Sequence, residues 1–187
     1  MKATALLRQQ HAEITNLFEQ VEDTTTDEDE VAVFERLAAM IAAHDAMERH
    51  VLYPRCIEKM GMNEQLGESL VEHGLIEFGL YQAVDALGGE DFTYKCNVLS
   101  DLVLHHIKEE EDEFFLLVDD AFDEEEQLAL GEELQRHYDD AMAKDFRRAL
   151  MQNLIGVLKG ALNPPPQNGA KKPRKAAPAK SERARHR

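Results

Sequence analysis

The feature that most constrains this chain is an internal repeat with a constant offset, equal to the separation of His73 from His11. The repeated positions are histidines and glutamates: His11, His44 and Glu48 in the first copy, and His73, His106 and Glu110 in the second. The two histidines have the same separation in both copies, and the later one always begins a His-x-x-x-Glu pair. The chain has only eight histidines, so agreement at every step indicates two copies of one structural unit.

Each copy has the sequence pattern of two helices joined by a turn. Polar turn formers at 24–29 and a Gly-Gly pair at 88–89 divide the copies, and Gly61-Met62-Asn63 separates one copy from the next. Between these breaks apolar residues recur every three or four positions, with no strand-like alternation of useful length. The sequence therefore predicts an all-α protein: an up-down-up-down bundle of four helices of roughly 20 to 30 residues.

Residue counting places the repeated histidines at matching depths in their hairpins. His11 precedes the turn at Thr24 by nearly as many residues as His44 follows the end of that turn near Glu30. The second copy has equal counts on the two sides of its Gly-Gly turn. The members of a His-x-x-x-Glu pair, such as His44 and Glu48, share one helix face. We therefore expect the imidazoles and carboxylates to converge inside the bundle.

An inward imidazole with a carboxylate one helical turn away, supplied twice, is typical of a di-iron or di-manganese site in a bundle. A single His-x-x-x-Glu pair on a helix is more often solvent-exposed. Two copies with matched upstream histidines favour the metal site.

The complete pattern resembles the hemerythrin-like, cation-binding (HHE) family over about residues 1–120. The matching residues are His11, His44-x-x-x-Glu48, Tyr53-Pro54, His73 and His106-x-x-x-Glu110. The resemblance implies two non-haem iron ions with an oxo or hydroxo bridge. It also implies that Glu48 and Glu110 bridge the irons, with the four histidines as terminal ligands.

Two departures from the oxygen-carrying hemerythrins concern possible ligands. Those proteins have a second histidine one turn after the third-helix ligand, where this chain has Glu77. A carboxylate there would stabilise ferric iron and weaken reversible oxygenation; Glu77 is either a ligand or a hydrogen-bond partner of one. The carriers also place the fourth-helix carboxylate five residues after its histidine, which fits His105, whereas only His106 obeys the repeat offset.

Other residues near the motif are expected to have lesser roles. Tyr53 could approach the metal, but Phe115 at the equivalent repeat position favours aromatic packing. Pro54 predicts a bend just beyond the first-copy ligands. His50 is expected to point away from the ligand face, and His137 lies outside the repeat.

Charge and composition divide the chain into three parts. Residues 1–122 form the predicted bundle, and residues 123–162 a C-terminal helical extension packed on it, with one helix from Glu124 to about Leu162. Residues 163–187 carry eight basic residues and one acid, so this tail is about +7 and the remainder about −23. We expect a disordered tail, either solvated or in weak contact with nucleic acid or acidic proteins.

No apolar run is long enough for a signal peptide or a membrane span, so we expect a cytoplasmic protein without a membrane partner. Cys56 and Cys96 lack the spacing of a disulfide framework or a thiolate site.

Three functions are consistent with these patterns. The favoured one is a redox di-iron protein that reacts with dioxygen, peroxide or nitric oxide and needs an electron donor. The second is iron sensing or handling, in which iron occupancy controls the stability of the bundle. The third is a metal-free helical module whose basic tail binds nucleic acid.

Overall fold

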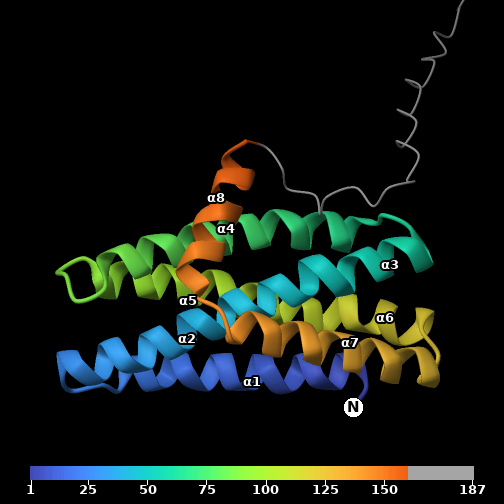
Figure 1. Cartoon of the computed structure of the whole chain (residues 1–187), viewed down its shortest axis with the longest axis horizontal. Coiled ribbons are helices and arrows are strands. Elements are labelled where there is room, and N and C mark those ends of the chain that lie inside the picture. The colour runs from blue at the N-terminus through green and yellow to red at the C-terminus, as the bar shows by residue number, and fades with distance from the viewer. Residues whose placement is uncertain (160–187) are drawn as a thin grey trace, which may run out of the picture.

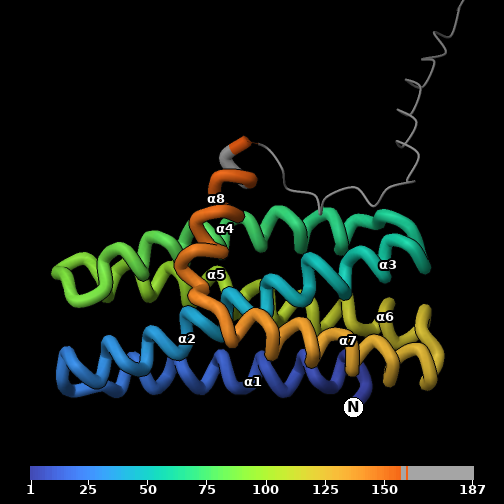
Figure 2. The backbone as a smooth tube through the Cα atoms, in the orientation of Figure 1, coloured from blue at the N-terminus to red at the C-terminus, as the bar shows by residue number. Residues whose placement is uncertain are grey.

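Four antiparallel rods form the body of the computed structural model, which describes residues 1–159 (Figures 1 and 2). The basic tail at 163–187 lies outside the described residues. The rods are, in order, α1 (Ala3–Glu22); α2 (Asp27–Met47) with the π-helical turn η1 (Glu48–Leu52) and α3 (Tyr53–Met60); α4 (Glu64–Ala86); and α5 (Phe92–Glu109) with the π-helical turn η2 (Glu110–Phe114) and α6 (Phe115–Ala121). Residues 1–159 contain no strand, and the predicted all-α, up-down-up-down bundle is confirmed.

The predicted turns separate the rods. Thr26 caps α2 by accepting a hydrogen bond from the Asp29 amide, which satisfies a free donor at the helix start. Gly61 and Gly88 adopt positive φ angles of 79° and 75°, a region that glycine enters without a steric cost. Rods one and two form the first hairpin, residues 3–60, and rods three and four form the second hairpin, residues 64–121.

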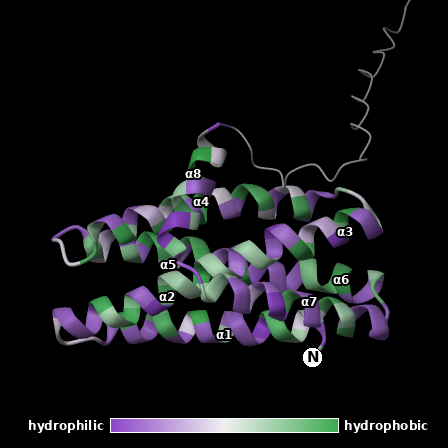
Figure 3. Ribbon diagram, in the orientation of Figure 1, coloured by the Kyte–Doolittle hydropathy of each residue, from purple (hydrophilic) through white to green (hydrophobic). Residues whose placement is uncertain are grey.

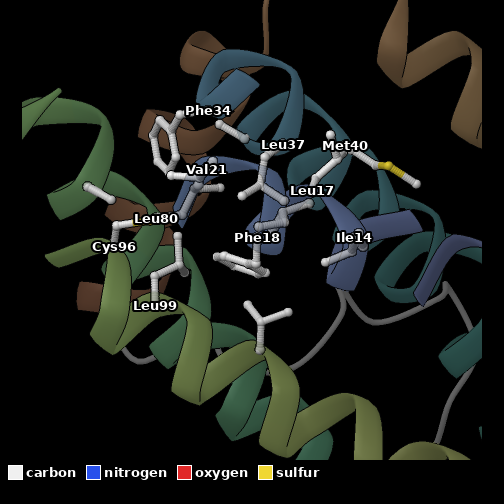
Figure 4. Close-up of a cluster of buried hydrophobic side chains, with 14 of the residues drawn as sticks. Ile14, Leu17, Phe18, Val21, Phe34, Leu37, Met40, Leu80, Cys96 and Leu99 are labelled. Carbon is white, nitrogen blue, oxygen red and sulfur yellow. The ribbon is translucent and has the colours of Figure 1, made fainter. Parts of the chain in front are cut away.

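A polar layer divides the bundle core into two apolar clusters. The first cluster fills the end where α1 meets α2 and α4 meets α5, and it includes Leu17, Phe18, Phe34, Leu80 and Leu99 (Figure 4). The second cluster fills the other end, between α1, α3, α4 and α6. Every helix carries both hydrophilic and hydrophobic residues (Figure 3), as expected when one face is buried. Six of the seven predicted metal-binding residues occupy the layer between the clusters.

The C-terminal extension consists of two helices, α7 (Glu124–Met142) and α8 (Phe146–Leu158), where the sequence predicted one. The break follows from Asp145, whose carboxylate accepts the Arg147 amide and so favours a new helix start. At the other end of α7, Asp123 and Glu126 form a capping box. Helix α7 packs along α1 and α2, whereas α8 crosses α2 and α4 (Figure 1).

Two further expectations concern disulfide bonds and membrane-spanning helices. Neither Cys56 nor Cys96 forms a disulfide, and both thiols are buried. Among residues 1–159, no helix combines the length and the hydropathy that crossing a bilayer requires.

Candidate metal centre

Six of the seven predicted metal-binding residues meet in the polar layer. They form two groups whose nitrogen and oxygen atoms lie within 4.8 Å of one another. The first group is His11, His44, Glu48 and Glu110, and the second is Glu48, His73, His106 and Glu110. All six are buried, with relative exposures of 6% or less. Because both groups contain both glutamates, the arrangement has two adjacent positions for a cation, with two carboxylates shared between them.

The shared glutamates connect the two hairpins. The Glu48 carboxylate lies 3.3 Å from Nε2 of His44 in its own hairpin and 3.3 Å from Nε2 of His73 in the other. Oε2 of Glu110 lies 3.5 Å from Nε2 of His11 and 3.7 Å from Nε2 of His106. Each carboxylate therefore faces one histidine of each hairpin, as a bridging ligand must.

A second side chain fixes the orientation of each histidine through Nδ1. The four pairs are His11 with Glu111 (2.9 Å), His44 with Gln10 (2.8 Å), His73 with Asp45, and His106 with Glu72 (2.7 Å). Each partner offers an oxygen acceptor, so every Nδ1 donates a proton. In the neutral ring the lone pair is then on Nε2, which faces the centre.

Sequence reasoning missed these four partners, although a signal for two of them was present. Gln10 and Glu72 are related by the same repeat offset, and each directly precedes a repeated histidine. Asp45 directly follows His44, but its repeat equivalent is Ile107, and that of Glu111 is Arg49. Nothing in the sequence distinguishes Asp45 or Glu111 from the other acids.

The two π-helical turns begin at the shared glutamates and obey the repeat offset. In η1 the amide of Tyr53 donates to the carbonyl of Glu48, and in η2 the amide of Phe115 donates to that of Glu110. In an α-helix, residue i+5 is rotated by about 140° around the helix axis from residue i. In a π-helical turn, the i→i+5 hydrogen bond places residue i+5 close to the same helix face as residue i. The π turns therefore direct Tyr53 and Phe115 toward the centre. Pro54 is not required for this, because its repeat equivalent is Leu116.

Tyr53 does more than the packing role that the sequence favoured. Its hydroxyl donates to Oε1 of Glu110 at 3.0 Å and lies 2.6 Å from Nε2 of His73. Burial and then the charges of Glu110 and Glu48 raise the pKa of this phenol well above its usual value. Tyr53 is thus a neutral hydrogen-bond donor at the second group when no cation is present. Its repeat equivalent, Phe115, stacks on His11 with ring centroids 5.5 Å apart.

Glu77, the seventh predicted residue, is buried but belongs to neither group. Its carboxylate lies 2.8 Å from the Arg49 guanidinium, which is 3.9 Å from Asp45. Glu77 thus pairs with Arg49, which in turn approaches Asp45, the Nδ1 partner of His73. Burial and then the charge of Asp45 raise the pKa of Glu77 to about 7, in spite of Arg49.

The other histidines lie away from the two groups. His105 is exposed and lies 3.2 Å from Glu109, so the structure brings His106, and not His105, to the centre. His50 is exposed and its ring stacks on that of His137 in α7, with centroids 5.4 Å apart.

Buried carboxylates raise the pKa values of two histidines. Burial by itself lowers the pKa of His11, but the neighbouring carboxylates of Glu110 and Glu111 outweigh it and raise the pKa to about 9. Burial also opposes the proton on His73, and Asp45 and Glu48 raise its pKa to about 10. Burial raises the pKa of Glu48, yet His44 and His73 hold it well below the usual range. The metal-free layer thus retains positive charge on two rings.

The side chains fit a pair of cations because several buried polar atoms lack any other partner. Both oxygens of Glu48, Oε2 of Glu110 and Nε2 of His106 form no hydrogen bond. Such atoms are costly to bury unless something binds them. Nε2 of His11 and His44 are 3.1 Å apart, close to the roughly 3 Å that separates two ligands at right angles around an ion with bonds of about 2.1 Å.

Comparison with known proteins agrees with this geometry. No curated protein and no solved structure matches the chain. A family model, that of the hemerythrin HHE cation-binding domain, matches residues 2–118, which include both hairpins almost completely. This match extends over more than half of the chain and covers all six residues of the polar layer. The chain therefore belongs to the hemerythrin HHE cation-binding family.

Proposed function

We propose that this chain binds two iron ions in its polar layer and reacts with a small oxidant such as dioxygen, peroxide or nitric oxide. The observation that carries the proposal is the pair of His-His-Glu-Glu groups that share both glutamates. Imidazole and carboxylate together suit iron and manganese, and shared carboxylates balance the charge of two adjacent ions. When bound, two adjacent ferrous ions supply two electrons to one oxidant.

The proposed ligands are the six residues of the polar layer. His11 and His44 form the first metal position, His73 and His106 form the second, and Glu48 and Glu110 bridge them. Glu77 is proposed to act indirectly, because it pairs with Arg49 and belongs to neither group of the polar layer. The Nδ1 hydrogen bonds keep each imidazole in the tautomer that presents Nε2 to an ion.

A small apolar cavity next to the layer favours a neutral diatomic reactant. Its volume is about 20 Å³, enough for one molecule the size of water. Three of the proposed histidine ligands border it, and its remaining wall is mostly aliphatic: Ile14, Ile41, Ile76, Val103 and Ile107. An apolar wall excludes anions and bulk water but admits dioxygen or nitric oxide.

Tyr53 is positioned to hold a proton beside the second metal position. Its hydroxyl already donates to Glu110, and it lies within hydrogen-bond distance of His73. A buried phenol with a raised pKa keeps its proton at neutral pH. We propose that Tyr53 donates a hydrogen bond to the small reactant or to a bridging carboxylate.

Metal analysis of protein purified without added metal tests the proposal. We expect two irons per chain in the wild type and in His137→Ala, and a visible absorption spectrum typical of a bridged ferric pair. Anaerobic reduction followed by rapid mixing with dioxygen, peroxide or nitric oxide should restore or change that spectrum. Fewer than one metal per chain, or full occupancy by zinc with no redox response, would contradict the proposal.

Iron sensing is a second candidate, supported by the buried atoms of Glu48, Glu110 and His106 that lack partners. Because a bound cation would satisfy these atoms, metal occupancy should strongly stabilise the bundle. A large metal-dependent rise in melting temperature with slow reaction toward every oxidant would select sensing over redox chemistry.

A further inference from the structure

The two metal positions differ in the charge that supports their histidines. The histidine from the second rod of each hairpin, His44 or His106, donates its Nδ1 proton to a residue of the preceding rod. In the first hairpin that residue is Gln10, a neutral amide, and in the second it is Glu72, a carboxylate. Gln10 and Glu72 are repeat equivalents, so the same place in the fold carries a different charge in each half.

The remaining two histidines each have a carboxylate partner. His11 donates to Glu111, which also pairs with Arg8 at 2.9 Å. His73 donates to Asp45, which lies 3.9 Å from Arg49. In each position a carboxylate supports the ring and an arginine offsets part of its charge. Gln10 is therefore the one neutral partner among the four, and Glu72 is the carboxylate at the equivalent place.

A carboxylate that accepts the Nδ1 proton makes the imidazole a stronger donor to a cation than an amide does. Loss of such a partner commonly lowers metal affinity by roughly 10- to 100-fold. We infer that the second metal position, His73 with His106, fills before the first, and that Glu72 and Gln10 are the positioning residues that set this order. The inference rests on the proposed metal site and adds that its two halves are unequal.

Stepwise addition of Zn²⁺ to the metal-free full chain, followed by NMR of ¹⁵N-labelled histidine side chains, tests the order of filling. Zn²⁺ is diamagnetic, so each Nε2 resonance reports its own ligation, and single histidine variants assign the signals. At one equivalent we expect the signals of His73 and His106 to shift, with a preference of about 10-fold or more. At two equivalents all four should have shifted.

Exchanging Gln and Glu at positions 10 and 72 tests whether the charge of the Nδ1 partner, and not another difference between the hairpins, sets the order of filling. Glu72→Gln should reduce the preference toward equal filling, and Gln10→Glu should do so by strengthening the first position. The double exchange Gln10→Glu with Glu72→Gln should invert the order, so that His11 and His44 shift first. Tyr53→Phe removes another difference between the halves and should leave the preference in place.

Equal filling in the wild type, or an order that neither exchange alters, would overturn the inference while all four histidines still bind Zn²⁺ at two equivalents. Failure of every histidine signal to shift would instead remove the metal site itself, and this inference with it. Melting curves of the metal-free variants show whether each exchange preserves the fold. The double exchange keeps the total charge unchanged, so its inverted order cannot arise from net charge.

Discussion

The first and second hairpins share a backbone but differ in the side chains next to the proposed metals. Both have two rods, both place histidines at matching depth, and both form a π-helical turn at the glutamate. The differences include Tyr53 against Phe115 and Gln10 against Glu72. The aromatic rings also differ in orientation: Tyr53 meets His73 edge-on at 90°, whereas Phe115 lies nearly parallel to His11 at 12°.

This comparison separates what builds the site from what adjusts it. The histidines and the glutamate that converge on the centre are the same in both halves. We infer that the arrangement of the two groups depends on these residue types. The residues that hydrogen-bond or cover those groups are free to differ, because they change the chemistry of a ligand without moving it. The predictions below test this division, beginning with the residues proposed to build the site.

Removing one histidine from either hairpin should have the largest effect. We expect His44→Ala and His106→Ala each to lose the ion of their own hairpin, since each position has only two histidines. The loss in affinity should exceed the roughly 10- to 100-fold that accompanies loss of a supporting partner. Metal analysis after purification provides the measurement, with His137→Ala as the matched control. Equal metal content in all three variants would contradict the ligand assignment, whereas unequal losses from the two histidine variants would break the equivalence of the hairpins.

Metal affinity should rise with pH, with one proton contributed by each hairpin. His11 and His73 are repeat equivalents, and carboxylates raise their pKa values to about 9 and about 10. Two cations, one in each position, must together displace both protons, so the overall affinity for the pair of ions should increase about 100-fold for each pH unit between about 7 and 9. Chelator competition at pH 7, 8 and 9 measures this slope. His11→Gln should reduce it to about 10-fold, and an affinity independent of pH would refute the prediction.

The same two protons should give the stability of the metal-free fold the opposite dependence on pH, so that it falls as the pH rises. A raised pKa stabilises the folded state fully below the unfolded value near 6.5, and this contribution disappears as the pH rises through 9 and 10. Thermal melting of metal-free protein should therefore show falling stability from pH 7 to pH 10. The gap between metal-bound and metal-free melting temperatures should widen over the same interval.

Tyr53→Phe should sharpen the comparison by making the two aromatic positions alike. In metal-free protein it removes the hydroxyl that donates to Glu110, leaving a buried oxygen without a donor. We expect a loss of about 1–3 kcal/mol in the free energy of unfolding, measured by urea denaturation. The loss should shrink when metal occupies Glu110. An equal loss with and without metal would mean that the hydroxyl stabilises packing alone.

Pro54→Leu should have the smallest effect. Leucine occupies the equivalent position in the second hairpin, where the π-helical turn forms without proline. We expect unchanged metal content and a stability change of no more than about 1 kcal/mol, which reflects the greater freedom of the unfolded chain. Loss of metal from this variant would show that the first π turn depends on its proline.

Sequence reasoning identified the residues that repeat and missed those that depend on local backbone geometry. The six residues of the polar layer were found because the offset and the turn positions fix their depth. Tyr53 was undervalued because a period of 3.6 residues rotates it away from Glu48, and the sequence does not reveal a π turn. Spacing alone does not show whether Glu77 reaches the centre or instead pairs with Arg49.

The C-terminal extension was harder to predict for a different reason. Its apolar periodicity continues across the junction between α7 and α8, so periodicity does not show the break. Asp145 decides it through a single hydrogen bond to a nearby amide. Apolar periodicity is read over many residues, so it does not reveal a single side-chain hydrogen bond of this kind.

The internal repeat has a consequence for how such a centre could arise. Each hairpin holds both histidines of one group and one of the two shared glutamates, at equivalent positions of the repeat. Two copies of a single ancestral hairpin would have formed the same ligand set as a homodimer. Gene duplication and fusion would then have released each half to diverge, which a symmetric dimer encoded by one gene cannot do.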